Sequence, residues 1–546
     1  MTTIEQATTA EAGEAASPAG RWQRFDALTE RWGERLNPIL VKESRQALKS
    51  KQFSITFALV LAFGWIWSML GVAWIGPEIY RENRGGDMFV GYYLILSFPL
   101  LVIVPFTAFR SLASEREDGT YELLSISTLR PRQVIGGKLA TALLQMMVYL
   151  SAMAPCLAFT YFLRGIDFLT ILWVIFWIFT ASVALSIFGL LLATATQARH
   201  WQVVLSVLLV LGLGIVFLMG IGLMLDFVQF GGRLGFQQRE FWIANAAVLT
   251  AVAAYCLLAW CIAAAQLSFV SENRSTGVRR VMLLHQALFA GWVAYLFAEW
   301  PEEEFVLVYM SLLALHWYVL GTFMTGEWPQ LSSRVKRSLP QTLLGRVFLT
   351  WFNPGPGTGY VFAVVNLAAG LLVGCGALYA WSRAMPGRTW RIGPEAIAVF
   401  GVVALCYVVI FLGLGRLIVA GLRRFFPVNM LLSVLLHVVL TQAAWIVPFV
   451  FLAMSDFRDQ YSLLHVTNWP WTLAQIAEEQ LTDMQLLAVL ISLPLTALFV
   501  LAANLPGVVA EVRHERVARP RRVAEEDAQL EAELHPPQPV QISPWD

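Results

Sequence analysis

Residues 109–140, FRSLASEREDGTYELLSISTLRPRQVIGGKLA, form a charged island between two long apolar runs, 88–108 and 139–163. The island mixes both signs of charge: Arg110, Glu115, Arg116, Glu117, Asp118, Glu122, Arg130, Arg132 and Lys138. A charge in the hydrocarbon core of a bilayer costs kilocalories. We therefore expect the island to lie in water at a membrane surface, with a spanning helix on either side of it.

The island also carries the signals of a break between two helices. Asp118-Gly119-Thr120 predicts a helix end and a new start, because Gly119 tolerates a positive φ and Thr120 can cap the next turn. Glu122 then falls in a first helical turn, where the helix dipole favours a carboxylate. Pro131 suits the first position of the following helix. The short segment has an apolar side made by Leu123, Leu124, Ile126 and Leu129.

Composition places the whole chain in a membrane. It has 546 residues, of which 58% are hydrophobic and 14% charged, with a mean hydropathy of +0.63. Soluble domains have about 25% charged residues, so we expect an all-α polytopic membrane protein. The net charge of +1 gives no reason to expect a nucleic-acid partner. All five cysteines fall inside apolar runs without metal-ligand spacing, so we expect neither a metal site nor disulfides.

Twelve apolar runs are long enough to span a bilayer, which predicts about twelve transmembrane helices in two six-helix halves. Their expected limits are 53–76, 88–108, 139–163, 168–194, 201–225 and 241–270, then 281–298, 304–324, 359–381, 394–421, 428–454 and 484–504.

The chain divides into five expected parts. Residues 1–20 lack an apolar core and predict a disordered tail, while 21–52 alternate apolar and charged residues as an amphipathic elbow helix does at a membrane surface. The two six-span halves are expected at 53–270 and 271–504. Residues 505–546 are basic, then acidic, then proline-rich, and predict a solvated tail.

The distribution of basic residues predicts the orientation. With the N-terminus inside, the inner segments hold 28 Lys and Arg residues and the outer loops hold 9. Inner loops of membrane proteins are enriched in Lys and Arg. We therefore expect a multi-pass protein of the plasma (cell inner) membrane with both termini in the cytoplasm, which places the charged island on the cytoplasmic side.

The island resembles the first cytoplasmic loop of type-2 ABC transporter permeases. The shared features follow one another in order: Glu115-Arg116-Glu117, Gly119-Thr120, Glu122, Leu123-Leu124, Ser125 to Thr128, Pro131 and Lys138. The string NPILVKESRQ (37–46) also resembles the entry of these permeases, whose elbow helix lies on the cytoplasmic surface. The resemblance covers roughly residues 35–200 well, and the second half only in outline.

The resemblance implies that this loop carries a coupling helix that docks on a separate ATPase subunit. The residues expected in the contact are Glu115, Glu117, Asp118, Gly119, Thr120, Glu122, Leu123 and Leu124. The carboxylates would make polar contacts and the two leucines would fill a groove. The alternative for this loop is a solvated connector whose charges only hold it out of the lipid.

A second, weaker copy of the pattern follows in residues 325–358. It keeps an acidic residue, a Leu-Ser-Ser stretch, a proline and a basic residue, here Glu327, Leu331, Pro340 and Arg346, but it lacks the acidic cluster and the Gly-Thr. If this copy is real, the chain fuses two six-span units into a pseudo-dimer; chance similarity is the alternative.

The chain lacks the motifs of nucleotide chemistry. Gly136-Gly137-Lys138 is only a fragment of a phosphate-binding loop, and no ABC signature occurs, so we expect no enzyme activity and no cofactor in this chain, with ATP bound by a partner. His285, His316 and His437 stand alone in the sequence and are interpreted as packing residues. Arg416 lies in a span near its expected cytoplasmic end, where we expect it to snorkel to the surface.

These features predict the membrane-spanning permease subunit of an ABC transporter. The expected partners are ABC-type ATPase subunits and the lipid bilayer, with a dimer or a pseudo-dimer as the working unit. Two alternatives stay open: an ATP-independent carrier or channel, and a non-transporting membrane anchor of an ATPase-driven complex. Carriers usually show ionisable residues along their path, and the spans nearly lack them.

Overall fold

The computed structural model describes residues 37–75, 85–119, 129–163, 165–195, 198–232, 234–269, 271–300, 302–384, 391–454, 461–518 and 520–534. The chain is an all-α polytopic membrane protein: in these ranges it has no strand, and twelve helices are long and apolar enough to cross a bilayer. It divides into two compact units, Met1–Leu267 (unit 1) and Ser268–Asp546 (unit 2). The predicted fold class and number of spans are confirmed.

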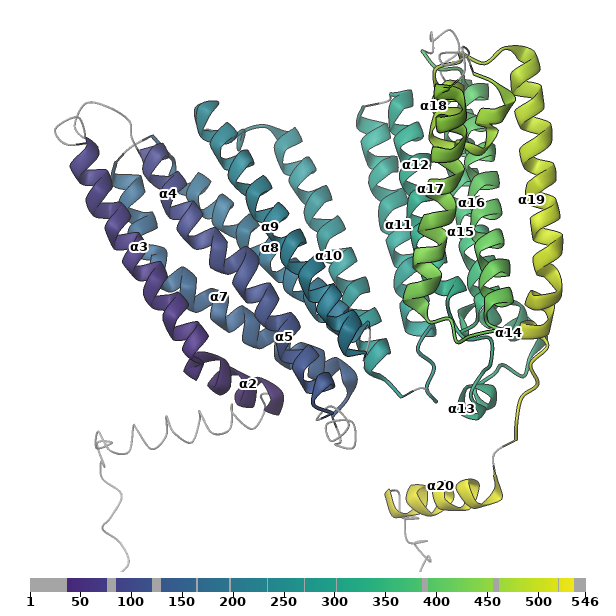
Figure 1. The fold of residues 1–546 in the computed structure, drawn as a ribbon, viewed down its shortest axis with the longest axis horizontal. Helices are drawn as coiled ribbons and strands as arrows, with labels where there is room; N and C mark the ends of the chain where they lie inside the picture. Colours follow the sequence, from purple (N-terminus) through teal and green to yellow (C-terminus); the bar gives the residue numbers. More distant parts are fainter. Residues whose placement is uncertain are drawn as a thin grey trace, which may run out of the picture. The chain divides into compact units, whose positions relative to one another are not determined.

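Unit 1 begins with a short helix and continues with six spans (Figure 1). The short helix is α2 (Pro38–Lys49), within the expected elbow; residues 21–36 of that elbow and the tail 1–20 lie outside the described residues. The spans are α3 (Lys51–Ile75), α4 (Gly85–Phe98) with η2 (Pro99–Ile103) and α5 (Val104–Glu117), α7 (Pro131–Phe162), α8 (Phe168–Thr194), α9 (Arg199–Gln229) and α10 (Arg239–Leu267).

Unit 2 also has six spans, with short helices at both of its ends. The spans are α11 (Thr276–Glu299), α12 (Glu303–Thr325), α15 (Pro356–Ala384), α16 (Pro394–Leu422), α17 (Met430–Ala453) and α19 (Asp483–Val512). At one end lie α13 (Ser333–Arg337), α14 (Leu343–Leu349) and η3 (Thr350–Phe352); at the other lie η4 (Leu463–Thr467) and α18 (Trp469–Ala477). Beyond α19 follows α20 (Arg521–Leu534).

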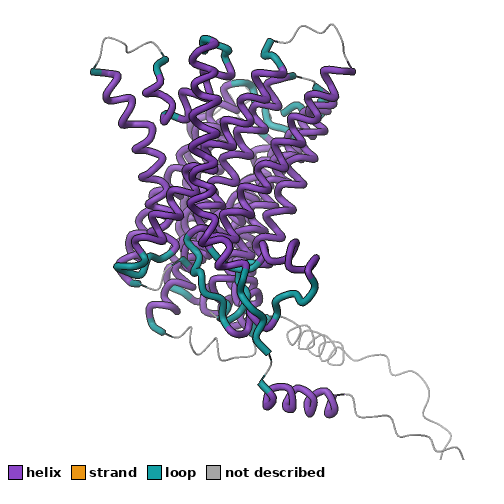
Figure 2. The backbone as a smooth tube through the Cα atoms, turned by 90° about the vertical axis from the view of Figure 1, so that its right-hand side faces the viewer, coloured by secondary structure: helices purple, strands orange, loops and turns teal. Residues whose placement is uncertain are grey.

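Most of the spanning helices, drawn as the long coils of Figure 2, are longer than the apolar runs that predicted them, whereas α8 matches its run and α10 and α17 are slightly shorter. The span expected to stop at residue 108 continues through α5 to Glu117, and the next begins at Pro131 rather than at 139. A helix can continue beyond the lipid because it satisfies its own backbone hydrogen bonds. The charged side chains of these extensions then lie outside the hydrocarbon. The predicted helix end is confirmed at Asp118, and Gly119 has a φ of +69°, while Thr120 and the predicted new start lie outside the described residues.

The most buried span of unit 1 is the composite of α4, η2 and α5, which packs against α7 and α8. It contains one π-helical turn, η2, beginning at Pro99. A π turn and a proline disturb the regular ladder of helical hydrogen bonds, and a hydroxyl from a neighbouring helix can satisfy a carbonyl there. Ser182 of α8 donates from Oγ to the carbonyl oxygen of Leu100. The irregular turn is therefore stabilised by the packing of α5 against α8.

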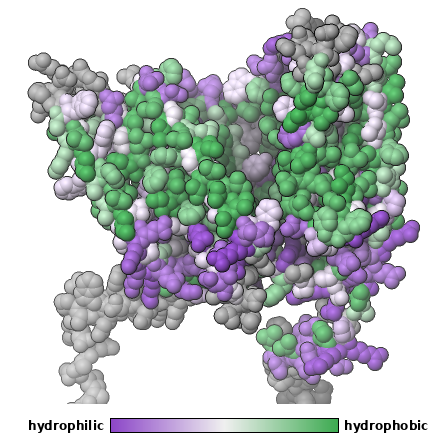
Figure 3. All heavy atoms as spheres, viewed as in Figure 1, coloured by the Kyte–Doolittle hydropathy of each residue, from purple (hydrophilic) through white to green (hydrophobic). Residues whose placement is uncertain are grey.

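Within each unit, hydrophobic side chains form a band around the spans, and hydrophilic side chains gather at the span ends that carry α2 in unit 1 and α13 in unit 2 (Figure 3). Many large apolar side chains on the outer spans are more than half exposed, for example Trp65, Leu218 and Phe499. This exposure is what contact with lipid predicts, because hydrocarbon replaces a protein neighbour there. α16 is the exception in unit 2, since its neighbours bury most of it.

Candidate functional site

A buried lysine joins three helices at the α2 end of unit 1. Lys138, in the second turn of α7, places Nζ 2.7 Å from Glu43 Oε1 of α2 and 3.1 Å from Glu115 Oε2 of α5. Nζ also donates to the carbonyl oxygen of Ser111 at 3.1 Å. The lysine side chain is 1% exposed, so its charge depends on these two carboxylates. The cluster fixes α2, the end of α5 and the start of α7 to one another.

The neighbouring residues of the acidic cluster point in different directions. Arg116 donates from Nη1 to the carbonyl oxygens of Ala193 and Thr194, at 3.3 and 2.6 Å. These are two of the last carbonyls of α8, which have no partner inside their own helix and carry the negative end of its dipole. Arg116 thus caps α8, while Glu115, one position earlier on α5, turns inward to Lys138. Two of the three charges of Glu115-Arg116-Glu117 therefore hold unit 1 together.

The remaining charges of the predicted docking loop face outward. Glu117, Asp118 and Gly119 are exposed, and Glu117 lies 3.8 Å from Arg110, a distance typical of a weak surface pair. Four predicted residues, Thr120, Glu122, Leu123 and Leu124, lie outside the described residues. Of the described part, Glu117 and Asp118 are the carboxylates that a partner could reach.

In unit 2, a buried arginine joins the ends of several spans next to α14. Arg279 of α11 is 1% exposed and donates from Nη2 to Glu327 Oε2 at 2.7 Å. Glu327 also accepts from Ser275 Oγ at 2.6 Å and from the Gly355 amide at 2.6 Å. Arg279 further donates to the carbonyl oxygen of Trp351. The starts of α11 and α15, the end of α12 and η3 are thereby joined.

A second buried ion pair lies at the same end of unit 2. Glu511, near the end of α19, accepts from the Gly357 amide at 2.8 Å and from the Thr358 amide at 3.0 Å, so its carboxylate caps the start of α15. Arg416 of α16 donates from Nη2 to Glu511 Oε1 at 3.2 Å and from Nη1 to Asn504 Oδ1 at 2.8 Å. This pair joins α15, α16 and α19.

The expectation that Arg416 snorkels to the membrane surface is wrong. Its side chain is 8% exposed and directed at Glu511 and Asn504 of α19. A charged group surrounded by apolar helices needs a counter-charge, and Glu511 supplies it. Arg423, just beyond the end of α16, contacts the end of α12 instead: it donates to the carbonyl oxygen of Gly326 at 2.6 Å. Burial lowers the pKa of Arg423, yet arginine keeps its charge at neutral pH.

The Gly357→Ala variant is expected to destabilise unit 2. A Cβ at this position would lie 2.8 Å from Arg416 Nη2 and 2.9 Å from Glu511 Oε1, so it would push the ion pair apart. We expect a loss of roughly 1–3 kcal/mol in the free energy of unfolding, the usual cost of overpacking. Thermal unfolding of the detergent-purified protein measures it. Gly376→Ala, on the same helix with no atom within 4 Å of the added Cβ, is the matched control, and equal melting temperatures for the two would contradict the prediction.

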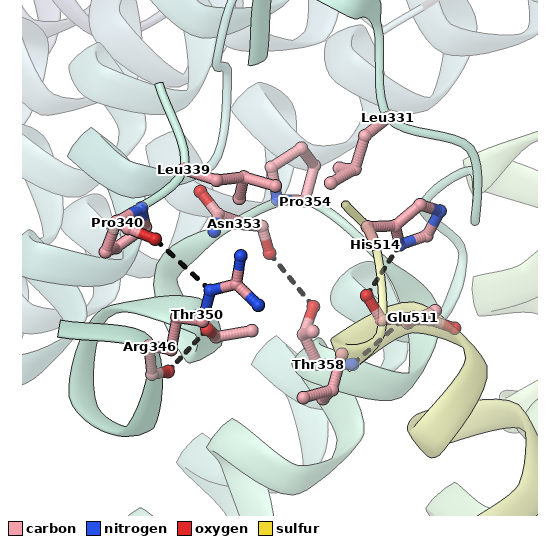
Figure 4. Close-up of a pocket in the computed structure, with 11 residues that line it drawn as sticks. Leu331, Leu339, Pro340, Arg346, Thr350, Asn353, Pro354, Thr358, Glu511 and His514 are labelled. Carbon is pink, nitrogen blue, oxygen red and sulfur yellow. Dashed lines mark hydrogen bonds between the residues drawn. The ribbon is translucent and has the colours of Figure 1, made fainter. Parts of the chain in front are cut away.

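Three of the four residues predicted in the second loop come together with the end of α19. Leu331, Pro340 and Arg346 line a narrow cavity, with room for about one water molecule, that Glu511 and His514 close from the other side (Figure 4). Arg346 folds back so that Nε donates to the carbonyl oxygen of Pro340 at 3.3 Å. Glu327 lies apart from this cavity in the Arg279 cluster. Its carboxylate is thus engaged within unit 2 rather than presented at the surface.

Two of the three histidines that stand alone in the sequence, His285 of α11 and His316 of α12, stack with their ring centroids 5.6 Å apart. Among the described residues, no group of three or more His, Cys, Asp or Glu side chains could hold a metal ion. No protein-family model, curated protein or solved structure matches this chain. Function must therefore be inferred from the residues and their geometry.

Proposed function

We propose that this chain is the membrane-spanning permease subunit of a type-2 ABC transporter, working with a separate ATPase subunit. The observation that carries the proposal is the Lys138 junction of unit 1. Three of the residues quoted for the resemblance meet there: Glu43 of NPILVKESRQ, Glu115 and Lys138. An exposed acidic pair, Glu117 and Asp118, follows directly at the same end.

The junction gives this proposal a mechanical basis. A partner that pushes on the segment after Glu117 acts on the ends of α5 and α7, and Lys138 ties both helices to α2. Helices are stiff along their axes, so a displacement at one end tilts the whole span. Six spans return the chain to the side on which it entered. In the proposed orientation both termini therefore face the cytoplasm, where ATP is available. The same holds for the two polar junctions, which are the Lys138 cluster of unit 1 and the Arg279 and Glu511 clusters of unit 2.

Docking is expected to depend on Glu117 and Asp118 rather than on Glu115. Reversal of Glu117 and Asp118 to Lys should weaken association with the partner ATPase subunit by about tenfold, or about 1.4 kcal/mol, because like charges would then oppose each other at the contact. Co-purification of the ATPase with the tagged permease measures the loss. Reversal of Glu115 is unsuitable, since it would place two cations together at Lys138.

The matched control is Glu240→Lys, an exposed carboxylate that opens α10 at the opposite end of unit 1. It should leave association unchanged. Unchanged association and transport in the Glu117 and Asp118 variant would count against this docking site. ATP-independent flux through the purified chain in liposomes would instead favour a carrier or channel. ATPase docking without any transported substrate would favour the membrane anchor.

A further inference from the structure

A short apolar helix in unit 2 is largely uncovered by the part of the chain that the structure describes. Within α14, five large hydrophobic side chains are 50–77% exposed: Leu343, Leu344, Val347, Phe348 and Leu349. Burial of such a side chain contributes about 1.5–3 kcal/mol, so five of them in water would be a considerable cost. Scattered apolar residues on a surface need no explanation, but a contiguous patch indicates an interaction site.

The surroundings of α14 place it at the level where the spans enter the membrane. Only the turn η3 and residues 353–355 separate it from α15. η3 itself is held at the start of α11, since Thr276 donates from Oγ1 to the carbonyl oxygen of Phe352 at 3.0 Å. α14 is thus fixed close to the first residues of two spanning helices. The apolar patch therefore lies at the level of the first turns of these two spans.

The chain segment that carries α14 bears charges of one sign. Residues 328–355 contain four basic residues, Arg334, Lys336, Arg337 and Arg346, and no acidic residue. From other segments, Glu272 lies 3.6 Å from Arg334 in an exposed pair, and Glu511 lines the same cavity as Arg346. Two aromatic residues follow the ends of α12 and α16: Trp328, over which Arg423 stacks at 5.0 Å, and Phe425, which is 84% exposed. Basic residues near a membrane surface gain about 1 kcal/mol each from anionic lipids, and aromatic rings favour the headgroup layer.

We propose that α14 lies in the headgroup layer of the bilayer, with its leucines and Phe348 in the acyl region and with anionic lipid headgroups beside Arg334 and Lys336. The first loop differs from this segment, because its exposed charges include the acidic Glu117 and Asp118 as well as the basic Arg110 and Arg132. In this proposal the second loop faces the lipid, whereas the first loop is the proposed contact with a protein partner. This inference needs only the spanning helices and stands independently of the ATPase.

The test measures the depth of α14 in the full chain. Spin labels are attached to cysteines at Leu344 and Phe348 and, as the matched control, at exposed Gln341, after replacement of the five native cysteines by alanine. In lipid nanodiscs, accessibility to oxygen reports hydrocarbon, and accessibility to a water-soluble nickel chelate reports water. We expect the oxygen-to-nickel ratio to be about threefold higher at Leu344 and Phe348 than at Gln341. Gel filtration of each labelled variant verifies that it is folded.

A second comparison tests the lipid headgroups. Nanodiscs of phosphatidylcholine alone are compared with nanodiscs that also contain phosphatidylglycerol, and the anionic lipid should move both labels deeper. The combined substitutions Arg334→Gln and Lys336→Gln should abolish that difference. Equal, water-like ratios at all three positions would overturn the proposal. So would labels that become protected only when ATPase subunits are added, because that result would assign the patch to a protein partner while leaving the proposed function intact.

Discussion

The Arg416→Met variant is expected to lose roughly 3–5 kcal/mol of stability, because it leaves the Glu511 carboxylate buried without its counter-charge. Glu511 would still cap α15, but the charge on this cap would be unbalanced among apolar helices. At about 2–4 °C per kcal/mol for a unit of this size, the melting temperature should fall by roughly 6–20 °C. Heating of the purified protein, followed by size-exclusion chromatography, measures the shift.

Two further variants separate the ion pair from simple packing. The double variant Arg416→Met with Glu511→Gln removes both charges, and it should recover part of the loss because no unpaired ion remains. Arg513→Met alters an exposed arginine just beyond α19, and it should change the melting temperature no more than surface substitutions usually do. A double variant that is less stable than Arg416→Met would show that the loss of stability does not come from an unpaired charge on Glu511.

The Lys138→Met variant is expected to have an effect of similar size in unit 1. Methionine fills a similar volume but leaves Glu43 and Glu115 facing each other without the cation between them. The loss of a buried partner typically costs roughly 3–5 kcal/mol, and the repulsion of the two carboxylates adds to it. The melting temperature should fall, and α2 should become more open to proteolysis because its tie to α7 is lost.

Arg132→Met is the control for this variant, since Arg132 lies on the first turn of the same helix and is exposed. It should change neither the melting temperature nor the proteolysis of α2. The triple variant with Glu43→Gln and Glu115→Gln should recover part of the stability of Lys138→Met. A Lys138→Met protein as stable as the Arg132→Met control would contradict the view that this lysine holds the junction.

The two polar junctions have one property in common: each ties the ends of several spans at one end of its unit. Lys138 joins α2, α5 and α7, while Arg279 and Glu511 together join α11, α12, α15, α16 and α19. Such a joint makes the span ends move as a group. This is the property that the proposed permease needs, because a push on one short segment must move several helices.

Local chemistry alone determined much of the fold. The apolar runs predicted twelve spans because the bilayer sets the length and composition of any helix that crosses it. The helix end at Asp118-Gly119 and the start at Pro131 were predictable because a positive φ and a missing amide are properties of single residues. The docking role of Glu117 and Asp118 stays a prediction.

Only the tertiary structure decided which charges face inward. Glu115 and Glu117 look alike in the sequence, yet Glu115 pairs with Lys138 and Glu117 is exposed. Lys138 and Glu43 are 95 positions apart, as are Arg416 and Glu511, so no local sequence pattern predicts either pair. The physical reason is that hydropathy fixes where a helix crosses the membrane, whereas the partner of a buried charge depends on which helices pack together and how each is rotated.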